Sequence, residues 1–192
     1  MFTVFSPGPG VVMTLTNSLN YGMKGAFGGI LGISVGALVI AAASATGLGV
    51  VLAGSTVAFG ITKAIGALYL GYLGVRLWRS PAFVFKEDEV GSAGFGRNFF
   101  RGVTLQFTNP KAIFFFLSVL PQFIDGDASY TLQFTLLALT YGLLIVAIHT
   151  LYAFGAQRTK TWLTSETGGH AINKLGGFLF ILFAVLLAVS RK

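Results

Sequence analysis

Apolar residues gather into six long runs that are separated by short polar stretches. The runs cover about residues 1–17, 25–52, 56–78, 102–124, 130–156 and 171–190. A helix needs about 20 apolar residues to cross the hydrocarbon core of a bilayer, and most of the runs reach that length. The pattern therefore predicts an all-α integral membrane protein with six transmembrane helices, of which the first is short.

The polar connections divide the chain into two halves. The most polar stretch, from Arg79 to Arg101, contains Lys86-Glu87-Asp88-Glu89 and predicts a solvated loop over residues 80–101. On either side lie three predicted helices, in residues 1–79 and 102–192. Basic residues mark the cytoplasmic side of membrane proteins, and here they gather in alternate connections. We therefore expect this loop to be cytoplasmic and both termini to lie outside. The basic C-terminal pair Arg191 and Lys192 argues for the opposite orientation.

The two halves resemble each other in sequence. The segment ITKAIGALYL at residues 61–70 shares Ile, Lys, Gly and Leu with INKLGGFLFI at residues 172–181. Residues 5–9, FSPGP, likewise match residues 107–111, FTNPK, as a Pro or Gly interruption inside an apolar run. Because three crossings return the chain to the opposite side, the pattern predicts two inverted three-helix repeats.

The paired interruptions are the candidate substrate site. A proline lacks a backbone donor, so these helices should break and expose amide and carbonyl groups at membrane depth. Such backbone is tolerated only where protein or a water-filled cavity covers it. Matching breaks in inverted repeats are typical of transporter substrate sites, and the predicted substrate-binding residues are Ser6, Pro7, Gly8, Pro9, Asn109, Pro110 and Lys111. The alternative is a pair of structural kinks.

Lys111 follows Pro110 directly and precedes three phenylalanines. A lysine in hydrocarbon costs about 2.5 to 3.5 kcal/mol on insertion scales, so it needs a role in the interior. Beside the free amides of a helix start, its charge favours a carboxylate ligand. The alternative is that its side chain reaches the membrane surface, which we also expect of Lys63 and Lys174 near their helix ends.

His149 lies in the fifth run and can change its charge near neutral pH, so it is the candidate for a coupling proton. The alternative is a structural histidine held by hydrogen bonds. No Asp or Glu falls inside a predicted helix core, so the sequence offers no carboxylate relay beside it.

Glycine is frequent, with 26 residues in all. The second run carries Gly25, Gly28, Gly29, Gly32 and Gly36 at spacings of three and four. Faces of small residues let membrane helices approach closely, so we expect this face to pack against another helix.

Composition supports the membrane assignment and narrows the function. The 192 residues are 54% hydrophobic and 10% charged, whereas soluble domains carry about 25% charged residues. The net charge of +7 is spread between apolar runs, which excludes a nucleic-acid-binding face. Without cysteine, and with few carboxylates and two histidines, the chain offers no thiol chemistry, cofactor site or metal site. Hydrolase and phosphate-loop motifs are missing, so we expect no enzyme.

Several of these motifs together resemble the LysE/RhtB family of amino-acid exporters. They are Ser6-Pro7-Gly8-Pro9, Lys63 with Gly66 to Gly74, Asn109-Pro110-Lys111-Ala112, Phe115-Phe116 and Pro121-Gln122-Phe123. The resemblance covers nearly the whole chain. It implies a multi-pass protein of the bacterial inner membrane, surrounded by lipid and often a homodimer. Such a protein exports amino acids or derivatives such as homoserine, homoserine lactone or threonine by proton-driven antiport.

The chain differs from the family pattern in two places, and two other functions are alternatives to amino-acid export. Family members have a longer apolar lead before Pro-Gly-Pro, and many carry an Asp where this chain has Gly36-Ala37. A metal-cation exporter is one alternative, although it would want carboxylates or thiolates that the predicted helices lack. A membrane scaffold without a transport cycle is the other.

Overall fold

The structure, a computed structural model, describes residues 4, 8–54, 56–81, 94–125, 127–163 and 165–189. Within these ranges the chain is helical and contains no strand. The helices are α2 (Pro9–Gly54), α3 (Thr56–Trp78), α4 (Phe95–Phe107), α5 (Pro110–Phe114), a π-helical turn η1 (Phe115–Val119), a 3₁₀ turn η2 (Leu120–Phe123), α6 (Tyr130–Arg158), α7 (Lys160–Leu163) and α8 (Glu166–Val189).

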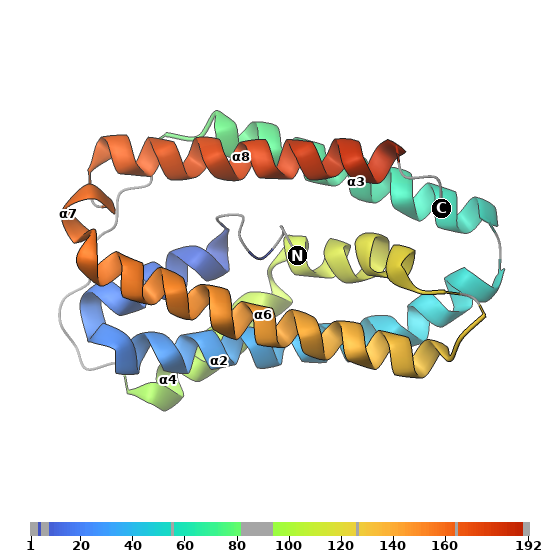
Figure 1. Cartoon of the computed structure of the whole chain (residues 1–192), viewed down its shortest axis with the longest axis horizontal. Coiled ribbons are helices and arrows are strands. Elements are labelled where there is room, and N and C mark those ends of the chain that lie inside the picture. The colour runs from blue at the N-terminus through green and yellow to red at the C-terminus, as the bar shows by residue number, and fades with distance from the viewer. Residues whose placement is uncertain are drawn as a thin grey trace.

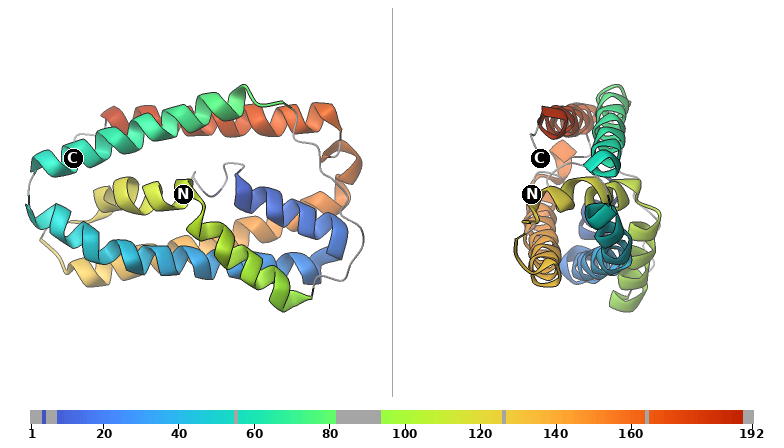
Figure 2. Two further views of the ribbon diagram at one scale, coloured as in Figure 1. Left: turned by 180° about the vertical axis from the view of Figure 1, so that it is seen from behind. Right: turned by 90° about the vertical axis from the view of Figure 1, so that its right-hand side faces the viewer.

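The long helix α2 reverses direction at Gly22. This residue has φ 65° and ψ −169°, a conformation open to glycine because it has no Cβ. Residues 9–21 then pack antiparallel to residues 23–54: a methyl group at Gly10 would lie 3.6 Å from Ile33, and Gly29 faces Asn17. Figure 2 shows the resulting hairpin in blue. Residues 9–21 are only about 20 Å long at 1.5 Å per residue, so this first helical segment is short.

Most of the predicted runs have a helical counterpart. Residues 23–54 correspond to the second run, and α3, α6 and α8 correspond to the third, fifth and sixth. The fourth run differs, because its helix begins at Phe95 and not at residue 102. The loop predicted over residues 80–101 is therefore wrong for residues 95–101. These seven residues include Arg97 and Arg101 and have apolar positions on one face only, so a search for continuous apolar runs misses them.

The fourth helical segment is broken, as its proline predicted. It stops at Phe107, resumes at Pro110, and its two parts are bent by 58°. The second part is not a regular α-helix beyond Phe114, because a π turn and then a 3₁₀ turn follow. Pro121, which has no N–H group, lies within that 3₁₀ turn, and the Gln122 side chain donates to the Ser118 carbonyl at 2.9 Å.

The helices form two layers (Figure 1). Helices α3 and α8 pair along their length in one layer, and α2, α4 and α6 pack together in the other, with α5 to η2 between them. The α3–α8 pair is antiparallel, since Gly74 lies beside Gly177 while Gly66 lies near Leu187. In the end view of Figure 2 the two layers are clearly separate.

Glycines set the distance between helices, as expected for the second run. A methyl group at Gly28 would lie 2.5 Å from the Phe95 carbonyl oxygen, and one at Gly36 would lie 3.0 Å from the Val103 carbonyl oxygen. Gly32 is in still closer contact with Phe99. The prediction of a packing face is confirmed, and its partner is α4.

Burial follows the pattern of a membrane protein, with large apolar side chains outside and polar ones inside. Leu68 and Leu143 are 76% and 71% exposed. The buried polar residues are Thr14, Asn17, Ser18, Ser34, Ser44, Asn98, Gln106, Asn109, Lys111, Ser118, His149 and Asn173. Within the described ranges, three helices are long and apolar enough to cross a membrane, and there are four if the bent pair from α4 to η2 is counted as one span.

Candidate functional site

The break between α4 and α5 is built around Asn109. Its backbone is extended, with φ −91° and ψ 96°, and its Oδ1 accepts a hydrogen bond from the Lys111 N–H at 3.2 Å. Its Nδ2 donates to Gln106 Oε1 at 2.8 Å, which ties the end of α4 to the start of α5. Asn109 is thus the N-cap of α5, with Pro110 in the first helical position, where a missing N–H group costs nothing.

The two interruptions predicted from the sequence meet at Lys111. A methyl group at Gly8 would lie 3.3 Å from Lys111 Nζ, so the first break directly adjoins the second. The Lys111 side chain is only 9% exposed, and its Nζ is 5.3 Å from the centre of the Phe180 ring. This burial argues against the alternative that Lys111 reaches the membrane surface. Ser6 and Pro7 lie outside the described residues.

The N-termini of two helices also lie close to Lys111. The hairpin segment of α2 begins at Pro9, with the Val12 N–H bonded to the Gly8 carbonyl at 3.0 Å, and α5 begins at Pro110. The first amides of a helix carry partial positive charge because they have no partner within the helix. Together with the Lys111 ammonium group, they make the junction of the two breaks electropositive.

An open cavity of about 360 Å³ leads to Lys111 from one side. Gly8, Pro9 and Asn109 line it together with Lys111, Phe180 closes one wall, and Arg76 and Ser80 near the end of α3 line it as well. The volume lies at the lower end of the range for small-molecule sites, about 300 to 1,000 Å³. Its described lining holds two cations and no carboxylate.

A much smaller chamber, of about 20 Å³, lies on the other side of Lys111. It is lined by Asn109 and Lys111 again, and by Gln106, Tyr141 and His149. A chamber of this volume has room for about one water molecule. Lys111 and Asn109 therefore line both the larger cavity and the small one.

His149 lies at the small chamber and is hydrogen-bonded. Its Nδ1 is 2.7 Å from the hydroxyl of Thr14, and both side chains are buried. A methyl group at Gly10 would lie 3.4 Å from the ring. The bond agrees with the structural alternative for His149, and its role in coupling stays a prediction.

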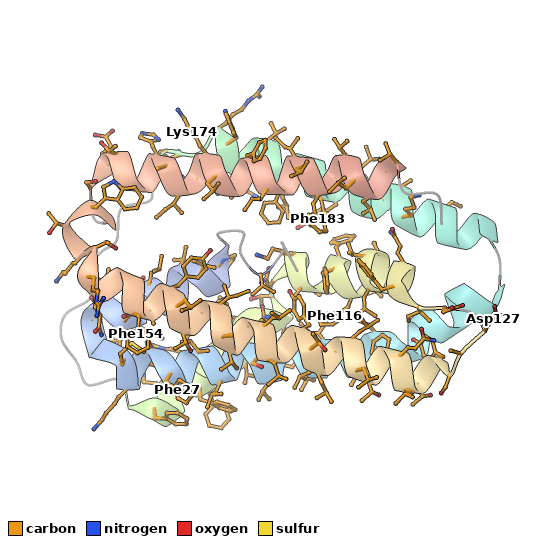
Figure 3. The ribbon with its side chains drawn as sticks, viewed as in Figure 1. Phe27, Phe116, Asp127, Phe154, Lys174 and Phe183 are labelled. Atoms are coloured by element: carbon orange, nitrogen blue, oxygen red, sulfur yellow. The ribbon has the colours of Figure 1, made fainter. Side chains whose placement is uncertain are left out.

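Aromatic rings pack around the second part of the broken helix. Phe115 stacks on Tyr141 with ring centres 4.5 Å apart, and Phe114 stacks on Tyr69 of α3 at 4.1 Å. Figure 3 shows Phe183 of α8 pointing into the space between the two layers, where it packs against the core. The α5 to η2 segment is thus held by α6 on one side and by the α3–α8 pair on the other.

A resident metal centre finds no support in the described part of the chain. No group of three His, Cys, Asp or Glu side chains comes together there. The other lysines that the sequence singled out lie elsewhere: Lys174 is exposed on α8, Lys63 is half-buried on α3, and neither lines the cavities at Lys111.

Comparison with known proteins places the chain in a family. A sequence profile described as LysE type translocator matches residues 1–191. The chain belongs to the LysE type translocator family. The resemblance inferred from the Pro-Gly-Pro and Asn-Pro-Lys-Ala motifs is thereby confirmed.

Two relatives of this translocator are named for a substrate. The homoserine/homoserine lactone efflux proteins of Salmonella typhi and Salmonella typhimurium are each 35% identical over 186 residues, which cover 97% of this chain and 90% of theirs. A protein of Vibrio cholerae, named uncharacterized membrane protein, is 33% identical over 197 residues, covering 98% of this chain and 93% of its own. No solved structure matches the chain.

Sequence reasoning missed some residues of the translocator's cavity. Arg76 stands near the end of the third run, where a basic residue fits the topology pattern, yet it lines the same cavity as Lys111. Gln106 is a polar residue inside an apolar run, three residues before Asn109, and this spacing could have indicated its hydrogen bond to the break.

Proposed function

We propose that this member of the LysE type translocator family exports amino acids or close derivatives, such as homoserine, homoserine lactone and threonine. The observation that carries the proposal is the meeting of the two chain breaks around buried Lys111. The names of the two Salmonella relatives support the same substrate class.

Lys111 is the group that would hold the substrate. Its ammonium group and the first amides of the two helices favour a carboxylate, and the same donors suit the ester carbonyl of a lactone. Arg76 adds a second cation to the cavity, and the described lining contains no carboxylate. This balance of charge supports substrates without a cationic side chain over lysine or arginine.

The two cavities support export by alternating access. The open cavity reaches Arg76 and Ser80, in and just beyond the last turn of α3. Helix α3 ends on the side of the molecule where α7 lies, while Asp127 lies at the other end (Figures 1 and 3). Basic residues gather at the α7 end, which we therefore assign to the cytoplasm. In this proposal, substrate enters the larger cavity from the cytoplasm and reaches Lys111.

The proposed architecture consists of six membrane spans arranged as two inverted repeats. The Gly22 reversal separates two spans within α2, α3 supplies a third, and α4 to η2, α6 and α8 supply the rest. Antiparallel packing of α3 on α8 supports inversion, because corresponding helices of inverted repeats run in opposite directions. We place the protein in the bacterial inner membrane, where a proton gradient can drive antiport. A homodimer remains a prediction from the family resemblance.

The experiment is efflux from vesicles that contain the purified protein. Vesicles are loaded in turn with labelled homoserine, threonine and lysine, with and without an imposed proton gradient. We expect gradient-dependent loss of homoserine or threonine, but not of lysine, compared with protein-free vesicles. If His149 carries the coupling proton, His149→Gln should retain exchange without a gradient and lose the gradient response. No loss of any of the three compounds from vesicles with correctly inserted protein would contradict the proposed function.

A further inference from the structure

A second and larger groove lies between residues 9–21 of α2 and helix α4. Its volume is about 970 Å³. Val12 and Met13 of α2 and Leu105 of α4 give it an apolar wall, and Arg97 and Arg101 lie at its edge. Neither arginine lines the cavity at Lys111, so the groove is a separate feature of the surface.

The polar groups of this groove are mainly hydrogen-bond donors. Arg97 and Arg101 are exposed, are four residues apart and so lie on one face of α4; the described residues give neither of them an ion-pair partner. Asn17 also lines the groove, but its Nδ2 is buried against Gly29 inside the α2 hairpin, so the two arginines are the charged groups that a ligand in the groove can reach.

The combination of donors and apolar wall indicates the ligand. Two guanidinium groups favour a phosphate, which each can bind through two parallel hydrogen bonds. A free phosphate would leave the wall of Val12, Met13 and Leu105 uncovered, whereas an acyl chain would cover it. Basic pockets between helices on the cytoplasmic side of a membrane are typical sites for anionic lipid headgroups.

We propose that this groove binds one anionic phospholipid. The phosphate lies against Arg97 and Arg101. One acyl chain lies between residues 9–21 and α4. The lipid thereby joins the first helical segment to α4, the helix that leads into the break at Asn109.

Native mass spectrometry of the full chain in detergent tests this site. Dioleoylphosphatidylglycerol and dioleoylphosphatidylcholine are added separately, and the bound fraction is measured for the wild type and for Arg97→Gln/Arg101→Gln. We expect one molecule of phosphatidylglycerol to bind more tightly than phosphatidylcholine. Since a basic residue near the membrane surface contributes about fivefold in affinity to an anionic lipid, the double variant should bind it about 25-fold more weakly.

The control variant is Lys24→Gln/Arg158→Gln, which removes the same charge from exposed positions that do not line the groove. It should bind phosphatidylglycerol like the wild type. A third variant, Thr104→Trp, keeps every charge but fills the groove, and it should also lose the lipid.

Three results would overturn the proposal. The first is equal binding of phosphatidylglycerol and phosphatidylcholine, and the second is an equal loss of phosphatidylglycerol binding in Arg97→Gln/Arg101→Gln and in the control variant. The third is displacement of the lipid by excess inorganic phosphate, which would indicate a simple anion site. If Arg97→Gln/Arg101→Gln cannot be purified, the wild type compared with Thr104→Trp decides the question alone.

Discussion

At the scale of single residues, Asn109 and Lys111 determine how the chain can break inside an apolar interior. The Asn109 side chain accepts from the Lys111 N–H and donates to Gln106, so polar groups left free by the break are paired. Lys111 then lies 9% exposed beside Gly8. Burying a lysine in an apolar interior costs free energy, so this position needs a reason in the interior.

The sequence predicted the break at Pro110 and singled out Lys111, because proline and an intramembrane lysine each have a physical cost that needs a reason. Most of the first predicted interruption, at residues 5–7, lies outside the described residues. The sequence could not predict Arg76, since a basic residue at the end of an apolar run has the same appearance whether it faces a cavity or the headgroups. Only packing of α3 against the broken helix decides between these cases.

The Thr14–His149 hydrogen bond gives a stability prediction. Thr14→Val should lower the free energy of unfolding by about 1 to 3 kcal/mol, because the buried His149 nitrogen loses its partner. Thr140→Val is the matched control on α6, since its exposed hydroxyl donates only to the Leu136 carbonyl of its own helix. Thermal unfolding in detergent measures both; an equal effect of the two substitutions would contradict the role of the hydrogen bond.

At the scale of elements, continuous apolar runs located most helices, and proline located the break. The start of α4 at Phe95 and the π turn Phe115–Val119 were not predictable in this way. The first depends on a helix with one apolar face, and the second on packing of Phe115 and Phe116 against Tyr141. The π turn directly follows the proposed substrate site, as such turns often do.

The glycine contacts between α2 and α4 give a prediction for an element. Gly32→Ala should lower thermal stability, with a cost of about 1 to 3 kcal/mol, because the added methyl group meets the Phe99 backbone. Gly155→Ala on α6 is the control, since nothing lies within 4 Å of the new methyl group. It should be neutral or stabilising, as alanine favours the helix. A loss of stability in Gly155→Ala as large as in Gly32→Ala would contradict the packing role of Gly32.

At the scale of the whole molecule, the fold brings the segment at Gly8 next to the helix break at Lys111, in one central location. Apolar side chains face outward, polar ones face inward, and a larger and a small cavity both reach Lys111. The all-helical class followed from periodicity, but the position of Gly8 beside Lys111 required the tertiary structure.

The most direct test of this account is homoserine efflux by Lys111→Met compared with Lys174→Met, at equal amounts of inserted protein. Lys174 is exposed on α8, so the control removes the same charge from the outside of the molecule. Since a hydrogen bond to a charged group contributes about 1.5 to 3 kcal/mol, we expect Lys111→Met to lower efflux roughly 10- to 100-fold, Lys111→Arg to recover part of it, and Lys174→Met to match the wild type. Unchanged efflux in Lys111→Met would contradict the central claim that substrate binds where the two breaks meet.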